Sequence, residues 1–364
     1  MLWGLFGNFA EKTGLKKQDI RAIAPEMLQN YLAQKGEKPF RARQIQEWLW
    51  QKGVHSFAEM TNLSQKMRTW LEEDFAIYPV KVDSVQKSKD GTLKFGFRLH
   101  DAHLIEGVLI PTETRMTACV SSQVGCSLTC SFCATGYMPR KRNLEPGEIY
   151  DQIRLLHQAA ETHYQMPLSN VVFMGMGEPL LNYANVLKGI EKISSPEGWG
   201  FSNRRITVST AGIAKMIRKL GDDEVRFNLA LSLHAANDAK RNQIMPINQQ
   251  NRLETLGEAL HYYYQKTRHR VTFEYIVFKD FNDGLQDAEE LYQFSKYVPA
   301  KVNLIEYNPI AEADFVNTDE DKLTTFAHYL QTRGLVVNIR RSRGKDIDAA
   351  CGQLAIKENK TASD

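Results

Sequence analysis

The sequence predicts an α/β protein, an open and partial βα barrel of about six parallel strands, preceded by a small helical domain and a short β extension. Two observations predict this architecture. After residue 116, short apolar segments alternate with amphipathic helical segments, which is typical of parallel βαβ units. Before residue 111, a helical spacing of apolar residues gives way to a period of two. We therefore expect three structural parts in a chain of 364 residues.

The first part, residues 1–78, has the apolar spacing of amphipathic helices. Apolar side chains recur at helical intervals in residues 27–32, 45–50 and 63–72. We expect these segments to pack together as a small accessory domain at the N-terminus.

The second part, residues 79–111, has the period of two that is typical of strands. The segments VKVDSVQ and TLKFGFRL flank the turn Lys89-Asp90-Gly91, and HLIEGVLIP follows them. This pattern predicts a β-hairpin extension with a third strand that leads into the next part of the chain.

The third part, residues 112–345, contains the alternating strands and helices. The expected strands lie in 116–120, SNVVFMGMG, RRITVSTAG, RFNLALSLH, RVTFEYIVF and KVNLIEYNP. Six βα units are too few to close an eight-unit barrel, so we expect an open one. Ligands of parallel α/β proteins bind at the carboxyl ends of the strands. Glycine and polar residues gather at these ends, in 175–178, 209–210, 232–234 and 308–309.

Composition narrows the class of protein. No run of about 18 apolar residues is present, and the opening segment lacks the basic region and cleavage site of a signal peptide. We therefore expect a cytoplasmic protein with no membrane partner. The five cysteines are an odd number with three crowded together, which favours reduced, chemically employed thiols over a disulfide framework. The net charge of +3 is small, so any binding of nucleic acid must depend on local basic patches.

Three cysteines lie close together in the segment VGCSLTCSFCATGYMPRKR. Cys126, Cys130 and Cys133 have the spacing C-x3-C-x2-C. A cubane iron-sulfur cluster usually takes four thiolates, so three thiolates leave one iron free for another ligand. A zinc site with one open position, or three buried cysteines, is the alternative interpretation of this spacing. The three-cysteine segment lies at the end of the first βα strand, and this position favours the iron-sulfur cluster.

The strand-end residues allow two interpretations that are compatible. Glycines such as Gly175 and Gly177 let main-chain groups approach a ligand closely, and Glu178 adds a carboxylate beside them. The same glycines could only form a tight turn, and Ser209 could only cap a helix. A single histidine at a strand end, as His234 is, more often has a structural role.

Two cysteines and one carboxylate remain outside these groups. An isolated cysteine, such as Cys119 or Cys351, is more often buried as a small apolar side chain than used in chemistry. Glu106 lies on an expected strand, where a carboxylate is usually the solvent-facing member of the alternation. From the residues alone, the three side chains have no assigned role.

Several segments together resemble one enzyme family. The three-cysteine spacing with Phe132 resembles the signature of the radical S-adenosylmethionine (SAM) superfamily. The surrounding segments are similar to those of the RlmN/Cfr family of radical SAM rRNA adenine methyltransferases. They are FRARQIQEWLW, SSQVGCSLTCSFCATG, VVFMGMGEPLLN, ITVSTAGI, ALSLHA, EYNP and RRSRGKDIDAACGQL. The resemblance spans essentially the whole chain.

The resemblance implies roles for each part of the chain and for its cofactors. Residues 1–78 would dock RNA, residues 112–345 would form the radical SAM core, and residues 346–364 would carry a methyl-accepting cysteine. A 4Fe-4S cluster would be held by Cys126, Cys130 and Cys133. SAM would be held by Gly177, Glu178, Ser209, Ser232, Leu233, His234 and Asn308.

The resemblance also implies a reaction that uses two SAM molecules per turnover. The first SAM methylates Cys351, and the second yields a 5′-deoxyadenosyl radical that takes hydrogen from the S-methyl group. The resulting methylene radical adds to an adenine and joins protein to RNA. Glu106 would accept a proton, and the Cys119 thiol would release the product by forming a disulfide with Cys351. An external electron donor and a disulfide reductant would complete the cycle.

The implied substrate is an adenine in the peptidyl-transferase centre of 23S rRNA, methylated at C2, with a tRNA anticodon-loop adenine as a second substrate. A C8-methylating Cfr-type resistance enzyme is the alternative within the family. A radical SAM enzyme that modifies peptides, and a metal-stabilised RNA-binding protein without activity, are the alternatives outside it. Basic residues that could contact RNA cluster in 140–142, 204–205, 268–270 and 340–345.

Overall fold

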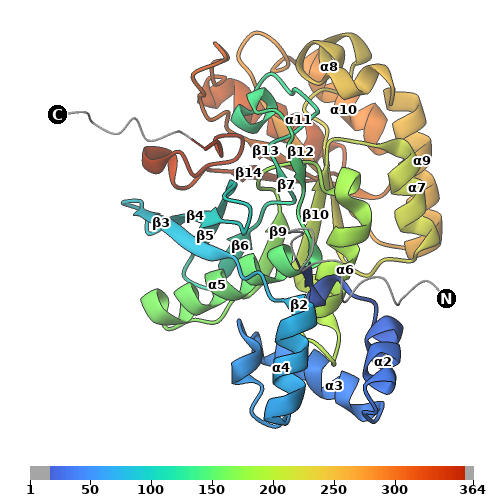
Figure 1. Ribbon diagram of the computed structural model, residues 1–364. Helices are drawn as coiled ribbons and strands as arrows, with labels where there is room; N and C mark the ends of the chain where they lie inside the picture. The colour runs from blue at the N-terminus through green and yellow to red at the C-terminus, as the bar shows by residue number, and fades with distance from the viewer. Residues whose placement is uncertain (1–16, 357–364) are drawn as a thin grey trace.

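The fold is built around one large twisted sheet, with helices packed along it and a small helical unit below (Figure 1). The computed structural model describes residues 17–356. Its main sheet has ten strands in the order β14-β13-β12-β11-β10-β9-β6-β5-β4-β3. Seven of them run parallel to their neighbours, which confirms the predicted α/β class and the parallel core. These seven are β6 (Met116–Cys119), β9 (Asn170–Phe173), β10 (Ile206–Thr210), β11 (Asn228–Ser232), β12 (Val271–Ile276), β13 (Ala300–Ile305) and β14 (Val336–Arg340).

The parallel core has one strand more than the six that the pattern predicts. The additional strand is β14, which pairs with β13 in register from Lys301 opposite Val336 to Ile305 opposite Arg340. Its residues are mostly exposed, because it has a sheet neighbour on one side only. An edge strand of this kind lacks the continuous apolar run that identifies a buried parallel strand.

The helices follow the strands as βα units and cover the outer side of the parallel core (Figure 1). Their apolar faces pack against a continuous core that includes side chains of every parallel strand except β14. They are α5 (Pro146–Tyr164), α6 (Tyr183–Ser194), α7 (Ala214–Asp222), α8 (Asp238–Ile244), α9 (Leu253–Thr267), α10 (Leu285–Ser295) and α11 (Glu320–Thr332).

Three antiparallel strands extend the sheet beyond β6. They are β3 (Lys81–Lys87), β4 (Leu93–Arg98) and β5 (Leu104–Pro111). The register pairs Lys94 with Val108 and Gly96 with Glu106, and it pairs Val108 with Cys119 of β6. Directly opposed residues of antiparallel strands point to the same face. Lys94, Glu106 and Cys119 therefore share one face of the sheet.

The N-terminal unit consists of short helices joined by tight turns. They are α2 (Pro25–Gln34), α3 (Phe40–Glu47), a π-helical turn (Trp48–Lys52) and α4 (Gln65–Asp74). The Tyr150 hydroxyl of α5 donates to the Trp50 carbonyl oxygen at 2.5 Å, and the two rings pack edge to face. Arg21 donates to both carboxylate oxygens of Asp151 on the same helix. The first 16 residues of the predicted accessory domain lie outside the described part of the chain.

The barrel is open, because β6 and β14 do not pair with each other. The segment 344–356, which we call the tail, passes between the β extension and the loop that carries the three crowded cysteines. The Ser88 hydroxyl donates to Asp346 at 2.5 Å, and the Gly344 N–H donates to Asp90 at 2.9 Å. At the other side, the Ala134 N–H donates to the Gly352 carbonyl oxygen at 2.7 Å. The tail thus occupies the open side of the barrel.

None of the helices in residues 17–356 is long and apolar enough to cross a membrane.

Arg21 forms buried ion pairs where the N-terminal unit contacts α5, and a first prediction concerns their effect on stability. Replacing Arg21 with methionine leaves Asp19 and Asp151 without their shared cation, so the free energy of unfolding should fall by about 3 kcal/mol or more. Urea unfolding followed by circular dichroism measures this change. Arg43→Met is the matched control, since its exposed pair with Glu47 should contribute less than about 0.5 kcal/mol. Equal losses for both variants would contradict this account of the junction.

Candidate active site

The three crowded cysteines lie on the loop after β6, at the carboxyl ends of the parallel strands. The loop packs on an apolar cluster that includes Phe132, Phe278 and Tyr307. Main-chain N–H groups face two of the thiols, those of Ser127 and Leu128 toward Cys126 and those of Thr135 and Gly136 toward Cys133. Such donors stabilise sulfur in its thiolate form, the form that binds metals.

This donor set fits an iron-sulfur cluster. Burial raises the pKa of Cys126 to about 11 and also raises the pKa of Cys130 and of Cys133. A strongly positive group is therefore needed to keep the three thiolates deprotonated. Among residues 17–356, no three His, Cys, Asp or Glu side chains gather closely enough to ligate one metal ion. A cubane cluster has a different requirement, since each thiolate binds its own iron corner.

Gly177 and Glu178 form the turn after β9. Gly177 has φ +92°, and a Cβ there would lie 2.5 Å from the Cβ of Gln123, so only glycine fits. The Glu178 carboxylate is buried and accepts hydrogen bonds from the Leu180 N–H at 3.0 Å and the Ala211 N–H at 2.8 Å. It therefore fastens the ends of β9 and β10 to each other. Burial raises the pKa of Glu178, and these N–H groups oppose that effect.

The other predicted strand-end residues lie on neighbouring strands in the same order. Ser209 is the residue before the last of β10 and Ser232 ends β11, and their hydroxyl oxygens are 3.2 Å apart. Leu233 has a fully buried side chain, so only its main chain is available to a ligand. Asn308 follows β13 and donates through Nδ2 to the Cys351 carbonyl oxygen at 3.1 Å. Its Oδ1 is buried and accepts no hydrogen bond within residues 17–356.

His234 is held as a structural side chain. Its Nδ1 accepts the Ile276 N–H at 3.1 Å, and its ring packs edge to face on Phe132 beside the third cysteine. Burial and the nearby Arg241 lower the pKa of His234 to about 3, so the imidazole is neutral at physiological pH. The residue has φ +54°, which turns its main chain at the strand end.

Arg241 of α8 supports this edge of the sheet and is not identifiable from the sequence. Its guanidinium is fully buried and donates to the carbonyl oxygens of Leu233 at 3.0 Å and Ala211 at 2.6 Å. It also donates to Asn248 at 2.6 Å. In the sequence, Arg241 lies in a polar helix among other charged residues, so nothing distinguishes it from a solvated side chain.

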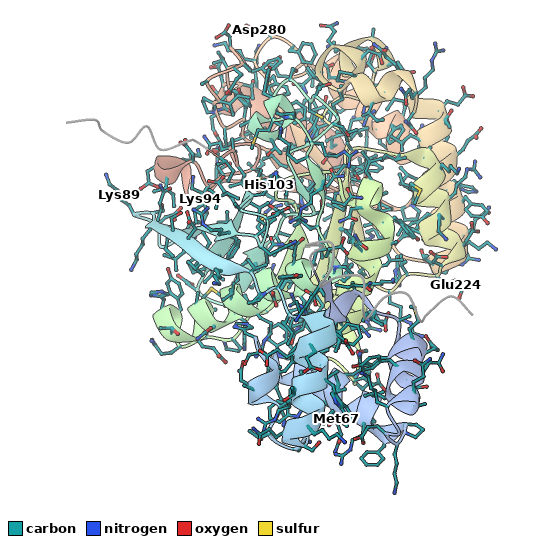
Figure 2. All side chains as sticks on the ribbon, in the orientation of Figure 1. Met67, Lys89, Lys94, His103, Glu224 and Asp280 are labelled. Atoms are coloured by element: carbon teal, nitrogen blue, oxygen red, sulfur yellow. The ribbon has the colours of Figure 1, made fainter. Side chains whose placement is uncertain are left out.

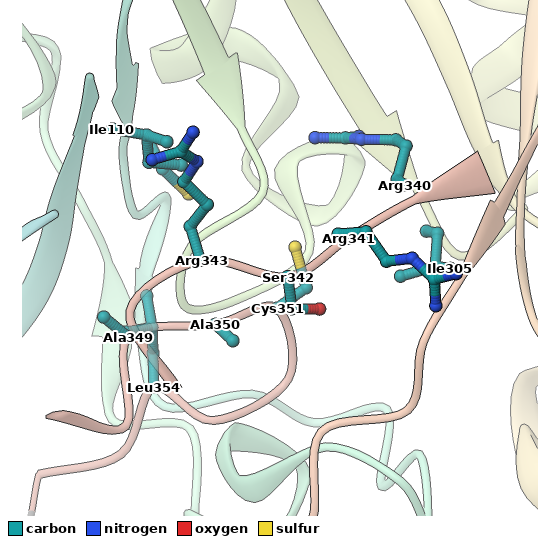
Figure 3. Close-up of a pocket in the computed structure, with 11 residues that line it drawn as sticks. Ile110, Ile305, Arg340, Arg341, Ser342, Arg343, Ala349, Ala350, Cys351 and Leu354 are labelled. Atoms are coloured by element: carbon teal, nitrogen blue, oxygen red, sulfur yellow. The ribbon is translucent and has the colours of Figure 1, made fainter. Parts of the chain in front are cut away.

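Cys119 and Cys351, from opposite ends of the core, line one pocket. Cys119 is buried at the end of β6, whereas Cys351 is exposed on the tail. Figure 3 shows the Cys351 sulfur pointing into the space between the side chains of Arg340 and Arg343. The full lining is Ile110, Cys119, Ile305, Arg340, Arg341, Ser342, Arg343, Ala349, Ala350, Cys351 and Leu354. The tail therefore brings together two thiols that the sequence leaves far apart.

The two thiols share one cationic neighbour. Burial raises the pKa of Cys119 to about 12, and the charge of Arg340 opposes this shift and acts on Cys351 in the same direction. The Arg340 guanidinium lies 3.5 Å from Glu274, a buried carboxylate on β12. Glu274 accepts the Asn303 side-chain amide at 2.8 Å, which holds it in place. These contacts connect Asn303, Glu274 and Arg340, and Arg340 lines the thiol pocket.

Glu106 is buried rather than facing solvent, in contrast to the usual alternation on a strand. It lies on the same sheet face as Cys119 but outside the residues that line the thiol pocket. Its Oε1 is 3.4 Å from the Nζ of Lys94. Desolvation raises the pKa of Glu106, and Lys94 opposes that effect. The sequence does not show that Lys94 is buried beside Glu106, because Lys94 has the position of an ordinary polar residue in an alternating strand.

The basic clusters fall into two groups. Residues 340–345 border the thiol pocket, and Arg140 and Lys141 are exposed on the cysteine loop. Residues 204–205 and 268–270 precede β10 and β12, so they lie at the amino ends of the strands, away from the site. Arg142 is used internally, since it donates to Asp101 and Glu148.

Two models of known protein families match parts of the chain. Residues 19–77 match the ribosomal RNA large subunit methyltransferase N-terminal domain, and residues 120–294 match the radical SAM superfamily. The two matches cover the helical unit and most of the parallel core.

Individual proteins are similar over nearly the full length. A probable dual-specificity RNA methyltransferase RlmN of Cytophaga hutchinsonii is 64% identical over 348 residues, which are 96% of this chain and 95% of that protein. The protein with the same description in Flavobacterium johnsoniae is 54% identical, over 94% of this chain and 99% of that protein. The crystal structure of a radical SAM methyltransferase from Sphaerobacter thermophilus is 37% identical, with a TM-score of 0.86, covering 93% of this chain and 99% of that one.

The contrast between Cys119 and Cys351 makes a second prediction. Iodoacetamide reacts with thiolates, and a pKa of about 12 leaves roughly one part in ten thousand of Cys119 ionised at pH 8. In the folded protein, Cys351 should therefore be alkylated at pH 8 while Cys119 stays unmodified. Peptide mass spectrometry measures both, and unfolding in urea should make Cys119 reactive. Equal labelling of the two thiols in the folded protein would contradict the geometry.

Proposed function

Because this chain belongs to the RlmN family of radical SAM RNA methyltransferases, we propose that it methylates C2 of an adenine in RNA, with Cys351 carrying the methyl carbon. The substrates in this proposal are an adenine of 23S rRNA in the peptidyl-transferase centre and an adenine of a tRNA anticodon loop. The description of the relatives as dual-specificity enzymes supports two RNA substrates.

The observation that carries the proposal is the pocket shared by Cys119 and Cys351. A methyltransferase that passes its methyl group directly from SAM to a nucleophile has no need for two thiols in one pocket. The adenine C2 position is an electron-poor C–H carbon, which does not attack the electrophilic methyl group of SAM. A thiol that first accepts the methyl group, and a second thiol that releases the product, answer this difficulty.

The strand-end residues would hold SAM beside the cysteine loop. Gly177 and Leu233 offer main-chain groups to SAM. Ser209 and Ser232 offer hydroxyl groups. Asn308 offers its buried Oδ1, which accepts no hydrogen bond within residues 17–356. The same Asn308 binds the Cys351 carbonyl oxygen, so the SAM pocket and the tail are in direct contact. This contact supports methyl transfer from one SAM molecule to the Cys351 sulfur, which leaves S-adenosylhomocysteine.

The remaining strand-end residues frame this SAM pocket from within the protein. Glu178 holds the turn after β9 against the end of β10, and His234 holds the end of β11 against β12. Their buried positions favour a role in shaping the pocket around SAM, in addition to any direct contact.

Cys126, Cys130 and Cys133 would hold a 4Fe-4S cluster, which with a second SAM molecule supplies a radical able to take hydrogen from an S-methyl group. An external electron donor would reduce the centre. The chain's own contribution is to exclude water with the apolar cluster around Phe132 and to keep the tail against the cysteine loop.

Release of the product would use both thiol-pocket cysteines and Glu106. In the adduct, the methylene carbon joins the Cys351 sulfur to adenine C2. The oxidised external electron carrier takes up the unpaired electron of the adduct, and Glu106 takes the proton from C2. The Cys119 thiolate attacks the Cys351 sulfur, the sulfur–carbon bond breaks, and its electron pair goes to the methylene group, which takes up a proton to become methyl. The two sulfurs end as a disulfide, so an external reductant must return two electrons.

RNA would reach the pocket across the basic residues that border it. Arg340 and Arg343 flank the Cys351 sulfur, where they could contact phosphate groups of a strand whose adenine is turned out of its stack (Figure 3). Arg140 and Lys141 on the cysteine loop extend this surface. The helical N-terminal unit would dock the rest of the RNA. An enzyme with these substrates would act in the cytoplasm.

C8 methylation by a Cfr-type enzyme is the weaker alternative, since the similar proteins are described as RlmN enzymes. The alternatives outside the family are not supported either. The RNA methyltransferase N-terminal domain separates the chain from peptide-modifying radical SAM enzymes, and the relatives are enzymes rather than binding proteins.

Analysis of the methylated nucleoside tests the proposal. Anaerobically reconstituted enzyme is incubated with SAM, a reductant and 23S rRNA from cells that lack the activity, and the RNA is digested for mass spectrometry. The expected product is 2-methyladenosine, identified against 2-methyl and 8-methyl standards. Cys351→Ala should give none of it while keeping the iron-sulfur absorbance. Formation of 8-methyladenosine, or normal methylation by the variant, would overturn the proposal.

A further inference from the structure

A buried ion pair lies on the sheet face that the tail covers. Lys94 of β4 and Glu106 of β5 point to the same face as Cys119 of β6, as the register of the three strands requires. Both charged side chains are nearly inaccessible, with 10% of the Lys94 side chain and 11% of the Glu106 side chain exposed. Charged groups are rarely buried to this degree unless they are paired and used.

Lys94 joins the β extension to the tail as well as to Glu106. Its Nζ is 3.4 Å from the Oε1 of Glu106 and donates to the Asp348 carbonyl oxygen at 3.5 Å. Figure 2 shows Lys94 on the extension, next to the C-terminal segment in red. The ammonium group therefore fixes the carboxylate and the segment that carries Cys351 at the same time.

Glu106 keeps one oxygen available. Its Oε2 is buried and accepts no hydrogen bond within residues 17–356, while Oε1 faces Lys94. A buried carboxylate oxygen without a partner is costly, so it indicates a group that is kept ready for another partner. A carboxylate must be ionised to accept a proton from the adenine ring.

The groups that face Glu106 come from each element packed around it. Lys94 faces it from β4, the Ala355 N–H approaches it from the tail, and Asp348 of the tail repels it. The Cys119 thiol lies on the same face of β6 and is neutral because of its high pKa. Burial raises the pKa of Glu106, and Lys94 is the strongest influence in the opposite direction. Without the ammonium group, burial and Asp348 would favour the protonated acid.

We propose that Lys94 is a positioning residue that keeps Glu106 ionised, with Oε2 free to take the C2 proton of the RNA adduct. This inference rests on the proposed function, because it assigns Lys94 to the release step of that reaction. The proton moves from adenine C2 to Oε2 of Glu106, and Lys94 keeps its own protons throughout. The β extension then contributes two residues, Lys94 and Glu106, to the active site.

The test measures the lifetime of the protein–RNA adduct as a function of pH in four proteins. Lys94→Met removes the charge with little change in volume, Lys94→Arg keeps it, and Lys87→Met is the control at an exposed lysine of β3. The fourth protein is the wild type. S-methylation of Cys351 is measured in each by mass spectrometry, and adduct decay is followed on denaturing gels in single-turnover reactions.

Lys94→Met should form S-methylated Cys351 and the adduct, yet release the RNA more slowly than the wild type at pH 7, because burial and Asp348 then favour the protonated acid. Raising the pH should restore the rate, because the affected group is an acid that ionises at higher pH. The acidic limb of the release rate should thus move to higher pH in this variant. Lys94→Arg and Lys87→Met should keep the wild-type profile.

Two results would overturn this role. An unchanged pH profile in Lys94→Met would show that the charge of Lys94 does not act on the release step. Slow release in Lys94→Met that high pH does not restore, or loss of S-methylation so that no adduct forms, would show that the ion pair only holds the fold. Failure of the proposed function itself is distinct, since the wild type would then form neither S-methylated Cys351 nor an adduct.

Discussion

The geometry of the site depends on the contact between the tail and the cysteine loop. The Thr135 hydroxyl donates to the Leu354 carbonyl oxygen at 2.5 Å, and the Ala134 N–H donates to that of Gly352. These bonds hold the tail in the gap between β6 and β14, which do not pair with each other. The Asn308 side chain, which donates to the Cys351 carbonyl oxygen, adds to this attachment. Cys351 thus faces Cys119, the strand ends that we propose to bind SAM and the basic residues before it.

The β extension completes this arrangement from the other side. Its β3–β4 turn binds the start of the tail through Ser88 and Asp90, and the Lys94–Glu106 pair binds it further along. The extension is continuous with the parallel core through β5 and β6, so the sheet itself sets the distance between the tail and the barrel. Parallel core, extension and tail thus act as one unit, although each looks independent in the sequence.

The sequence predicts the fold class and the order of its parts because strand and helix periods differ clearly along the chain. It does not predict β14, whose exposed edge position removes the apolar signal. The motif segments identify the cysteines and strand-end residues, but only through family resemblance, since a lone cysteine looks like packing. Lys94 and Arg241 have no sequence signal, because burial of a charge follows from tertiary contacts. Glu274 could have been noticed, since a carboxylate within a wholly buried strand is unusual.

The central claim is that the tail holds Cys351 where it exchanges with Cys119. A single turnover without disulfide reductant, followed by alkylation and digestion under non-reducing conditions, tests this directly. Mass spectrometry should then find the Cys119 and Cys351 peptides joined by a disulfide, in an amount equal to the methylated RNA formed. Methylated RNA accompanied by two free, alkylated thiols at Cys119 and Cys351 would contradict the account.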